Sequence, residues 1–337
     1  MKSFLRMSQM KYRTVAEILR DVSSLLSHSG VRDGNRYRLP SPIMFELANP
    51  LARFTCDTGN SLDTAVAAAE SLYMLSGMNG PDFIWEFRRW EDPRKTREDR
   101  RVDDGAFGPP LRFLGQKTLA VLDYLGTARI RQLINTGCVD QLGQAISRLE
   151  GKEKKAFIQF SSFNNSLSVH SAWFCVANDK IEMMVSAGEV NHSDLYCKIL
   201  SPFAFLHQLV SDLTGIPVGS SRFMISSLWA DRADPPKFLS DSKLPVVDTH
   251  DFQYANGKLT LRDVDILTSI MIEFVSQLDK SNLCRANPFE RDGRVQLWQD
   301  YANVFKVWKA KTLSVEIDIP FFFHPQLRYA FGDGAII

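Results

Sequence analysis

The stretch from residue 171 to residue 213 constrains the fold most, because it combines paired strands with a buried helix. Two apolar runs, 171–176 and 180–186, flank Asn178-Asp179, a dipeptide that tolerates the left-handed conformations of a tight hairpin turn. A helix is predicted over 202–213, where large apolar residues recur at the spacing of one helical face. The sequence therefore predicts an α+β fold.

Composition excludes several classes of protein. A chain of 337 residues with 45% apolar content can bury one large core or two ordinary ones. No apolar run approaches the ~20 residues that a membrane span needs, and the first ten residues lack the apolar stretch of a signal peptide. A net charge of +1 gives no general attraction for nucleic acid. We expect a cytoplasmic protein that binds neither membranes nor nucleic acid.

The cysteines suggest neither disulfides nor a metal site. They are odd in number, scattered and without a CxxC pair: Cys56, Cys138, Cys175, Cys197 and Cys284. A disulfide framework needs paired cysteines, and a zinc site needs closely spaced ligands. We expect reduced thiols and no bound metal.

Periodicity predicts the remaining elements. Helices are expected over 12–26, 64–75, 139–149, 261–278 and 295–309, strands over 43–47 and 156–161, and a polar loop over 29–42. Because its expected elements are mostly helices, segment 248–313 is predicted to be an insertion or subdomain. It would separate a core of residues 1–247 from a C-terminal segment, 314–337, that returns to the core.

Short motifs along the chain occur in a recognisable order. They are Arg32-Asp33-Gly34-Asn35, Ala69-Glu70-Ser71-Leu72-Tyr73-Met74-Leu75, Phe107-Gly108-Pro109-Pro110-Leu111-Arg112, Lys154-Lys155, Ala177-Asn178-Asp179-Lys180-Ile181 and His324-Pro325. Their order resembles that of the thymidylate synthase and pyrimidine (dCMP) hydroxymethylase family. The resemblance implies a thymidylate-synthase-like mixed sheet packed with helices, a pyrimidine nucleotide ligand, and a homodimer packed sheet on sheet.

The resemblance also implies roles for single residues. Arg32 would bind the nucleotide phosphate, Glu70 would order water near the pyrimidine, and Lys154-Lys155 would serve the pocket of the partner subunit. By the same resemblance, Phe107, Arg112 and Asn191 would occupy further positions of the substrate pocket. Independently of the family, Glu70 lies in an apolar helix, where an ionised carboxylate needs a polar partner or a cleft.

The nucleophile strand departs from the family pattern. The family cysteine, which adds to C6 of the pyrimidine, falls on Ser168, or on Val169 if one residue is deleted. A serine is a poor nucleophile unless a base activates it. His170 lies two residues from Ser168, on the same strand face, and is the candidate base. Alternatively, both side chains line a polar cleft.

Two ligand-binding positions differ as well. The family's phosphate-binding arginine corresponds to Gly188, and the asparagine that contacts the pyrimidine edge corresponds to Ile199. Glu189 adds a like charge beside the phosphate position.

Three functional hypotheses follow. In the first, the chain is a divergent family member that binds a pyrimidine nucleotide or related anion without cysteine-dependent one-carbon transfer. In the second, it is an active C5 methyl- or hydroxymethyltransferase with rearranged chemistry. In the third, it is a non-catalytic homodimeric structural or partner-binding protein. We favour the first hypothesis and assign no cofactor, since a folate is implied only if the family chemistry survives.

Overall fold

A computed structural model describes the chain over residues 10–54, 61–77, 82–88, 111–112, 140–160, 168–231, 259–283, 286–290, 295–318 and 320–331. These residues form a mixture of helices and strands, which confirms the predicted α+β class. Two compact units divide the chain: Met1–Thr55 with Ala145–Val246, and Cys56–Gln144 with Val247–Ile337. The sequence-based division at residues 247 and 313 stays a prediction.

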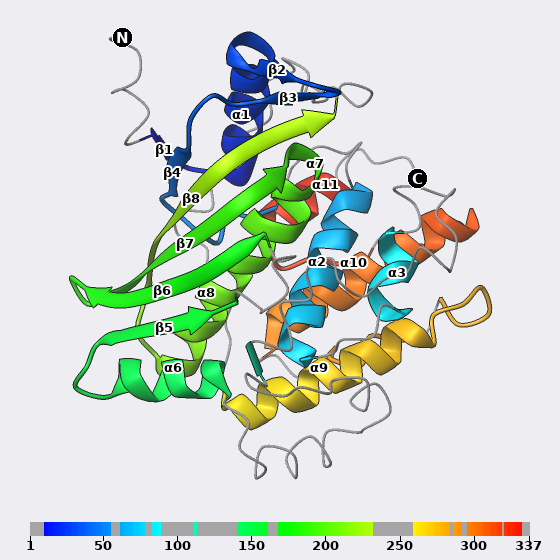
Figure 1. The fold of residues 1–337 in the computed structure, drawn as a ribbon. Coiled ribbons are helices and arrows are strands. Elements are labelled where there is room, and N and C mark those ends of the chain that lie inside the picture. The colour runs from blue at the N-terminus through cyan, green and yellow to red at the C-terminus, as the bar shows by residue number, and fades with distance from the viewer. Residues whose placement is uncertain are drawn as a thin grey trace. The chain divides into compact units, whose positions relative to one another are not determined.

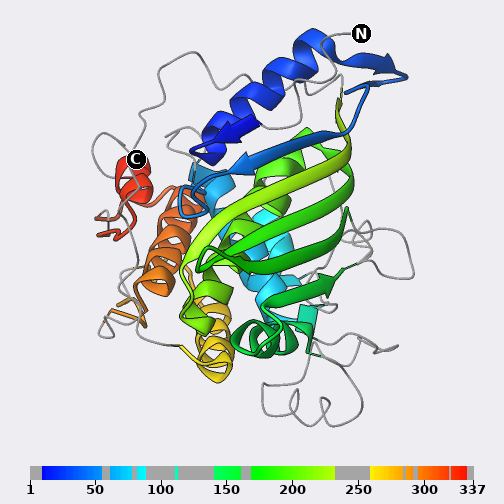
Figure 2. The ribbon, with the colours of Figure 1, turned by 90° about the vertical axis from the view of Figure 1, so that its left-hand side faces the viewer.

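An open mixed sheet forms the first unit (Figure 1). Its strands run in the spatial order β1 (Met10–Tyr12), β4 (Ile43–Leu47), β8 (Val218–Asp231), β7 (Lys180–Asn191), β6 (Val169–Ala177) and β5 (Lys155–Gln159). The pairs β1–β4 and β7–β8 are parallel, whereas β4–β8, β7–β6 and β6–β5 are antiparallel. Figure 2 views this sheet from its open face.

The turn between β6 and β7 forms as the sequence predicts. Asn178 and Asp179 both have positive φ, 50° and 57°, and Ala177 pairs with Lys180 across the turn. Left-handed conformations at both central residues match the right-handed twist of the flanking strands. The hairpin prediction is confirmed.

The predicted polar loop over 29–42 is wrong in part. It contains a hairpin of β2 (Val31–Asp33) and β3 (Arg36–Arg38), turning at Gly34 with φ of 59°. Strands of three residues are too short to show an alternating pattern in the sequence. Their pairing depends on β8, against which β3 lies antiparallel at residues Trp229–Asp231.

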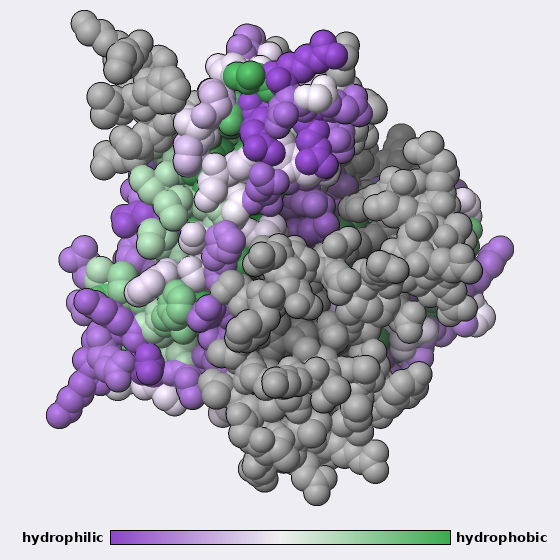
Figure 3. All heavy atoms as spheres, in the orientation of Figure 1, coloured by the Kyte–Doolittle hydropathy of each residue, from purple (hydrophilic) through white to green (hydrophobic). Residues whose placement is uncertain are grey.

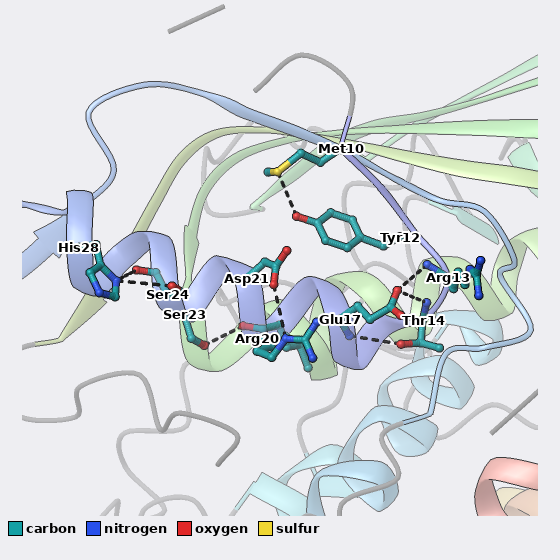
Figure 4. Close-up of polar contacts among 11 residues, drawn as sticks. Met10, Tyr12, Arg13, Thr14, Glu17, Arg20, Asp21, Ser23, Ser24 and His28 are labelled. Carbon is teal, nitrogen blue, oxygen red and sulfur yellow. Dashed lines mark hydrogen bonds and ion pairs between the residues drawn. The ribbon is translucent and has the colours of Figure 1, made fainter. Parts of the chain in front are cut away.

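Helix α1 (Val15–Ser29) begins later than predicted because Tyr12 belongs to β1. A capping box fixes its first turn (Figure 4). The backbone N–H of Glu17 donates to the hydroxyl of Thr14 at 3.2 Å, and the Glu17 carboxylate accepts from the backbone N–H of Thr14 at 3.3 Å. This reciprocal pairing satisfies two of the donors that a helix start leaves free.

A helical crossover joins the parallel strands β7 and β8. It consists of α7 (His192–Asp194), the π-helix η5 (Leu195–Leu200) and α8 (Ser201–Thr214), which packs against both strands. The predicted apolar face of α8 is buried, namely Phe203, Leu206, Val210 and Leu213. His207 and Gln208 are buried too, so α8 lies almost wholly in the core.

The described part of the second unit is helical. It contains α2 (Ser61–Ser76), α3 (Asp82–Arg88), α9 (Leu261–Ser276), α10 (Gln296–Leu313) and α11 (Pro325–Phe331), and α6 (Gln141–Glu150) spans the unit boundary. Helix α2 packs against α3, α9 and α10. The ring of Phe87 lies 4.3 Å from that of Trp308 and 5.2 Å from that of Phe305. None of the described helices has the length and apolar character needed to cross a membrane.

Candidate functional site

Three neighbouring strands of the sheet break their alternation close together: the breaks of β7 and β8 lie at the same level, and that of the antiparallel strand β6 lies on the other side of the Val169–Ala187 pair. Core residues recur every second position in a regular strand. Here successive core residues lie three apart, at Val169 and Ala172 in β6, Ala187 and Val190 in β7, and Ile225 and Leu228 in β8, all at most 1% exposed. Val169 pairs with Ala187, and Ala187 pairs with Ile225.

The residues between these core positions are a group on three adjacent strands that we call the polar row: His170, Ser171, Gly188, Glu189, Ser226 and Ser227. Bulges that add a residue to a strand often redirect side chains beside functional sites. The polar row is therefore the candidate site of the first unit.

His170 occupies the bulge of β6, where the pairing with β7 shifts register between Val169 and Ser171. Its backbone carbonyl accepts a hydrogen bond from Phe160 N–H at 2.9 Å, and the Ser168 carbonyl accepts from Gly188 N–H at 2.7 Å. The backbone on both sides of the bulge is thus held, while the imidazole is exposed.

Gly188 lies directly beside this imidazole. A Cβ atom at position 188 would lie 2.8 Å from Nε2 of His170 and 3.8 Å from the carbonyl oxygen of Ser168. The structure therefore brings Ser168, His170 and Gly188 together on adjacent strands. No hydrogen bond joins the His170 ring to Ser168 among the described residues, and the proposed base role of His170 stays a prediction.

Charged side chains flank the row. Nη2 of Arg38 lies 3.1 Å from a carboxylate oxygen of Glu189, and its Nε lies 3.7 Å from Asp33. This ion pair offsets the negative charge that Glu189 brings to the row. Within the described residues, the buried hydroxyl of Ser227 and Nε of Arg38 have no hydrogen-bond partner.

Two other predicted site residues lie near this end of the sheet. Asn191 ends β7, and its side-chain oxygen accepts a hydrogen bond from Ser193 N–H at 3.2 Å, which caps α7. Sequence reasoning missed this capping role, although asparagine before a helix is a common signal for it. Arg32 is exposed in β2, opposite Tyr37, which itself pairs with Ala230 of β8.

The lysine pair lies at the other end of β6. Lys155 pairs with Cys175, five residues from His170, or roughly 17 Å along the strand. Lys154 and Lys155 are both exposed. Within one chain they are therefore separated from the polar row.

The remaining candidates belong to the second unit. Arg112 is buried, with Nη2 2.7 Å from Asp265 and Nε 3.4 Å from Asp140, and it donates to the Leu75 carbonyl at 3.3 Å. Burial raises the pKa of Asp140, while Arg112 acts to lower it. Glu70 is buried in α2 and has an interaction partner, as its apolar surroundings lead one to expect. Phe107 lies outside the described residues.

The two carboxylate partners of Arg112 were not predicted from the sequence. Asp140 stands directly before α6 and accepts from Gly143 N–H at 3.2 Å, so it is recognisable as a helix-capping residue. Asp265 lies 153 residues from Arg112 and gives no comparable local signal.

Exposed apolar side chains gather on the open face of the sheet. Phe157, Trp173, Met184 and Met224, the open-face patch, are 38%, 51%, 39% and 39% exposed. The rings of Phe157 and Trp173 lie 4.6 Å apart, and Trp173 pairs with Met184 across the strands. Figure 3 shows green, hydrophobic atoms over this part of the sheet.

No group of three metal-binding side chains occurs among the residues with described positions. Comparison of the sequence with protein-family models and with curated proteins gave no match. The resemblance to thymidylate synthases therefore rests on the sequence motifs quoted above alone.

Proposed function

We propose that this chain is a divergent thymidylate-synthase-like protein that binds a pyrimidine nucleotide or related anionic small molecule at the polar row. One observation carries the proposal. Ser168 and Gly188, which correspond to the family's nucleophile and phosphate-binding arginine, lie against each other on two adjacent strands, close to where each strand breaks its alternation. A bulged, polar break in an otherwise apolar sheet is a common setting for a ligand.

The proposal excludes cysteine-dependent transfer to C5 of the pyrimidine. Such transfer needs a thiolate that adds to C6, whereas the aligned positions hold Ser168 or Val169. Of the cysteines in the described part of the chain, Cys197 is buried, and Cys175 lies seven residues along the chain from Ser168. The proposed protein therefore holds its ligand without this reaction.

The proposal includes a homodimer joined through the open-face patch. A two-fold axis places the same surface on both subunits, so a flat apolar patch can cover its own copy. Burial in an interface disfavours an unpaired charge. The carboxylate of Glu46, beside the patch, is paired with Lys11 at 3.2 Å and with Arg222 at 2.9 Å, so it does not oppose such burial. Lys155, two residues from Phe157 on β5, would then lie near the partner subunit.

Thermal-shift measurements with dUMP, dCMP, UMP, CMP and folates test the ligand. A ligand at 100 times its dissociation constant stabilises the folded state by about 2.7 kcal/mol, which raises the melting temperature measurably. We expect stabilisation by at least one pyrimidine nucleotide. If none stabilises the protein, the proposed function is wrong.

Tritium release tests the chemistry separately. We expect a bound nucleotide labelled at C5 to keep its tritium, both with and without folate. Release would instead support an active transferase with rearranged chemistry.

A further inference from the structure

We propose that His170 binds the phosphate group of the nucleotide, at the place where the related enzymes use an arginine that is Gly188 here. This inference rests on the proposed function and names the residue that recognises the anion.

The first argument is the way the backbone presents the imidazole. His170 is the extra residue of the β6 bulge, and the hydrogen bonds of Phe160 and Gly188 hold the chain on both sides of it. The side chain is exposed and therefore accessible to a ligand. An imidazole N–H is a good donor to phosphate oxygen.

The second argument is the glycine beside it. Glycine weakens the interior of a strand and often marks close approach by another group. At position 188 that group is the His170 ring, because any Cβ would come within 2.8 Å of Nε2. The absence of a side chain at 188 thus allows the ring to occupy the space from which the family's arginine would extend.

The third argument concerns local charge. Glu189 would repel a phosphate, but Arg38 holds its carboxylate at 3.1 Å. This ion pair therefore reduces the repulsion between Glu189 and an anion beside His170.

Calorimetric titration with dUMP and with deoxyuridine tests the inference, since the ratio of the two affinities reports the phosphate contact. We expect the wild type to prefer dUMP, and His170→Ala to lose about tenfold or more of that preference, with deoxyuridine binding unchanged. His28→Ala, which removes another exposed histidine of the same unit, is the control and should keep the wild-type ratio.

Two further variants separate the contact from a structural role. Gly188→Ala displaces the free end of the His170 ring without removing it, so it should lower the dUMP preference while the melting temperature hardly changes. In His170→Ala/Gly188→Arg, the arginine has room and should restore the preference.

The outcomes distinguish the two proposals. If dUMP binds and His170→Ala keeps the wild-type ratio, the role of His170 is overturned and the proposed function stands. If the wild type binds none of dUMP, dCMP, UMP and CMP, the proposed function fails and the role of His170 fails with it.

Discussion

Nδ1 of His207 lies 2.8 Å from the hydroxyl oxygen of Ser221, deep in the core between α8 and the sheet. Nε2 lies 2.7 Å from the carbonyl oxygen of Ile181. Because a carbonyl only accepts, Nε2 carries a proton; because burial disfavours a charged ring, Nδ1 carries none and accepts from the Ser221 hydroxyl. The ring is therefore neutral and joins α8, β7 and β8.

This neutral histidine predicts a loss of stability in mild acid. Burial lowers the pKa of His207 from 6.5 to about 4, although the Ile181 carbonyl acts to raise it. The unfolded chain thus binds a proton first, and the free energy of unfolding should fall by up to about 3 kcal/mol as the pH drops from 6.5 to 4. Urea unfolding at several pH values measures this, and His207→Gln should flatten the slope. An equal slope in that variant would contradict the prediction.

The buried charge of Arg53 predicts a loss of stability when its hydrogen-bond partner is removed. Its buried guanidinium donates to Gln208 at 2.6 Å and lies over the rings of Phe54 and Phe205, while Nε and Nη2 have no partner among the described residues. Gln208→Ala removes the hydrogen bond, so it should destabilise the protein by roughly 2–4 kcal/mol.

An apolar replacement is the control for this effect. Arg53→Met/Gln208→Leu removes both polar groups and should recover most of the lost stability in chemical unfolding. If the double variant is as unstable as the single one, the burial of an uncompensated charge is not the cause.

The Arg112 ion pairs predict that removing Arg112 destabilises the fold by an amount that depends on pH. Arg112→Ala leaves Asp140 and Asp265 without their buried cation and should destabilise the fold by roughly 3–5 kcal/mol at neutral pH. The pKa of Asp140 is already raised by burial, and losing Arg112 would raise it further. Since the folded state then binds a proton more readily than the unfolded state, the cost should shrink as the pH falls. A cost independent of pH in urea unfolding would argue against this cause.

The open-face patch predicts the oligomeric state. Trp173→Glu places a charge in the proposed interface and should convert a dimer into a monomer in sedimentation velocity. Ile266→Glu is the matched control, because Ile266 is similarly exposed, at 43%, but lies on α9 of the other unit. A monomeric wild type, or a dimeric Trp173→Glu variant, would refute the interface.

Local signals explain which parts of this fold the sequence predicts. The β6–β7 hairpin and helices α8, α9 and α10 follow from turn chemistry and from periodicity within single segments. The β2–β3 hairpin escaped prediction because its short strands depend on β8, far along the chain.

The candidate site was predicted only in part for the same reason. Ser168 and His170 were chosen from the sequence, yet Gly188 becomes their neighbour only through the β6–β7 pairing. The partners of Arg112 likewise depend on long-range packing, and the bulge at His170 needs both strands to be defined.

The shared break in β7 and β8 also limits how this protein can evolve. Deleting one residue from either strand there would turn every side chain beyond the deletion to the opposite face, while the neighbouring strands keep the old phase. Compensation would require matching deletions in both neighbours, so intermediates would carry misplaced core residues. Lineages should therefore exchange side chains at the break freely while keeping its length, so the exposed chemistry there can change faster than the backbone that presents it.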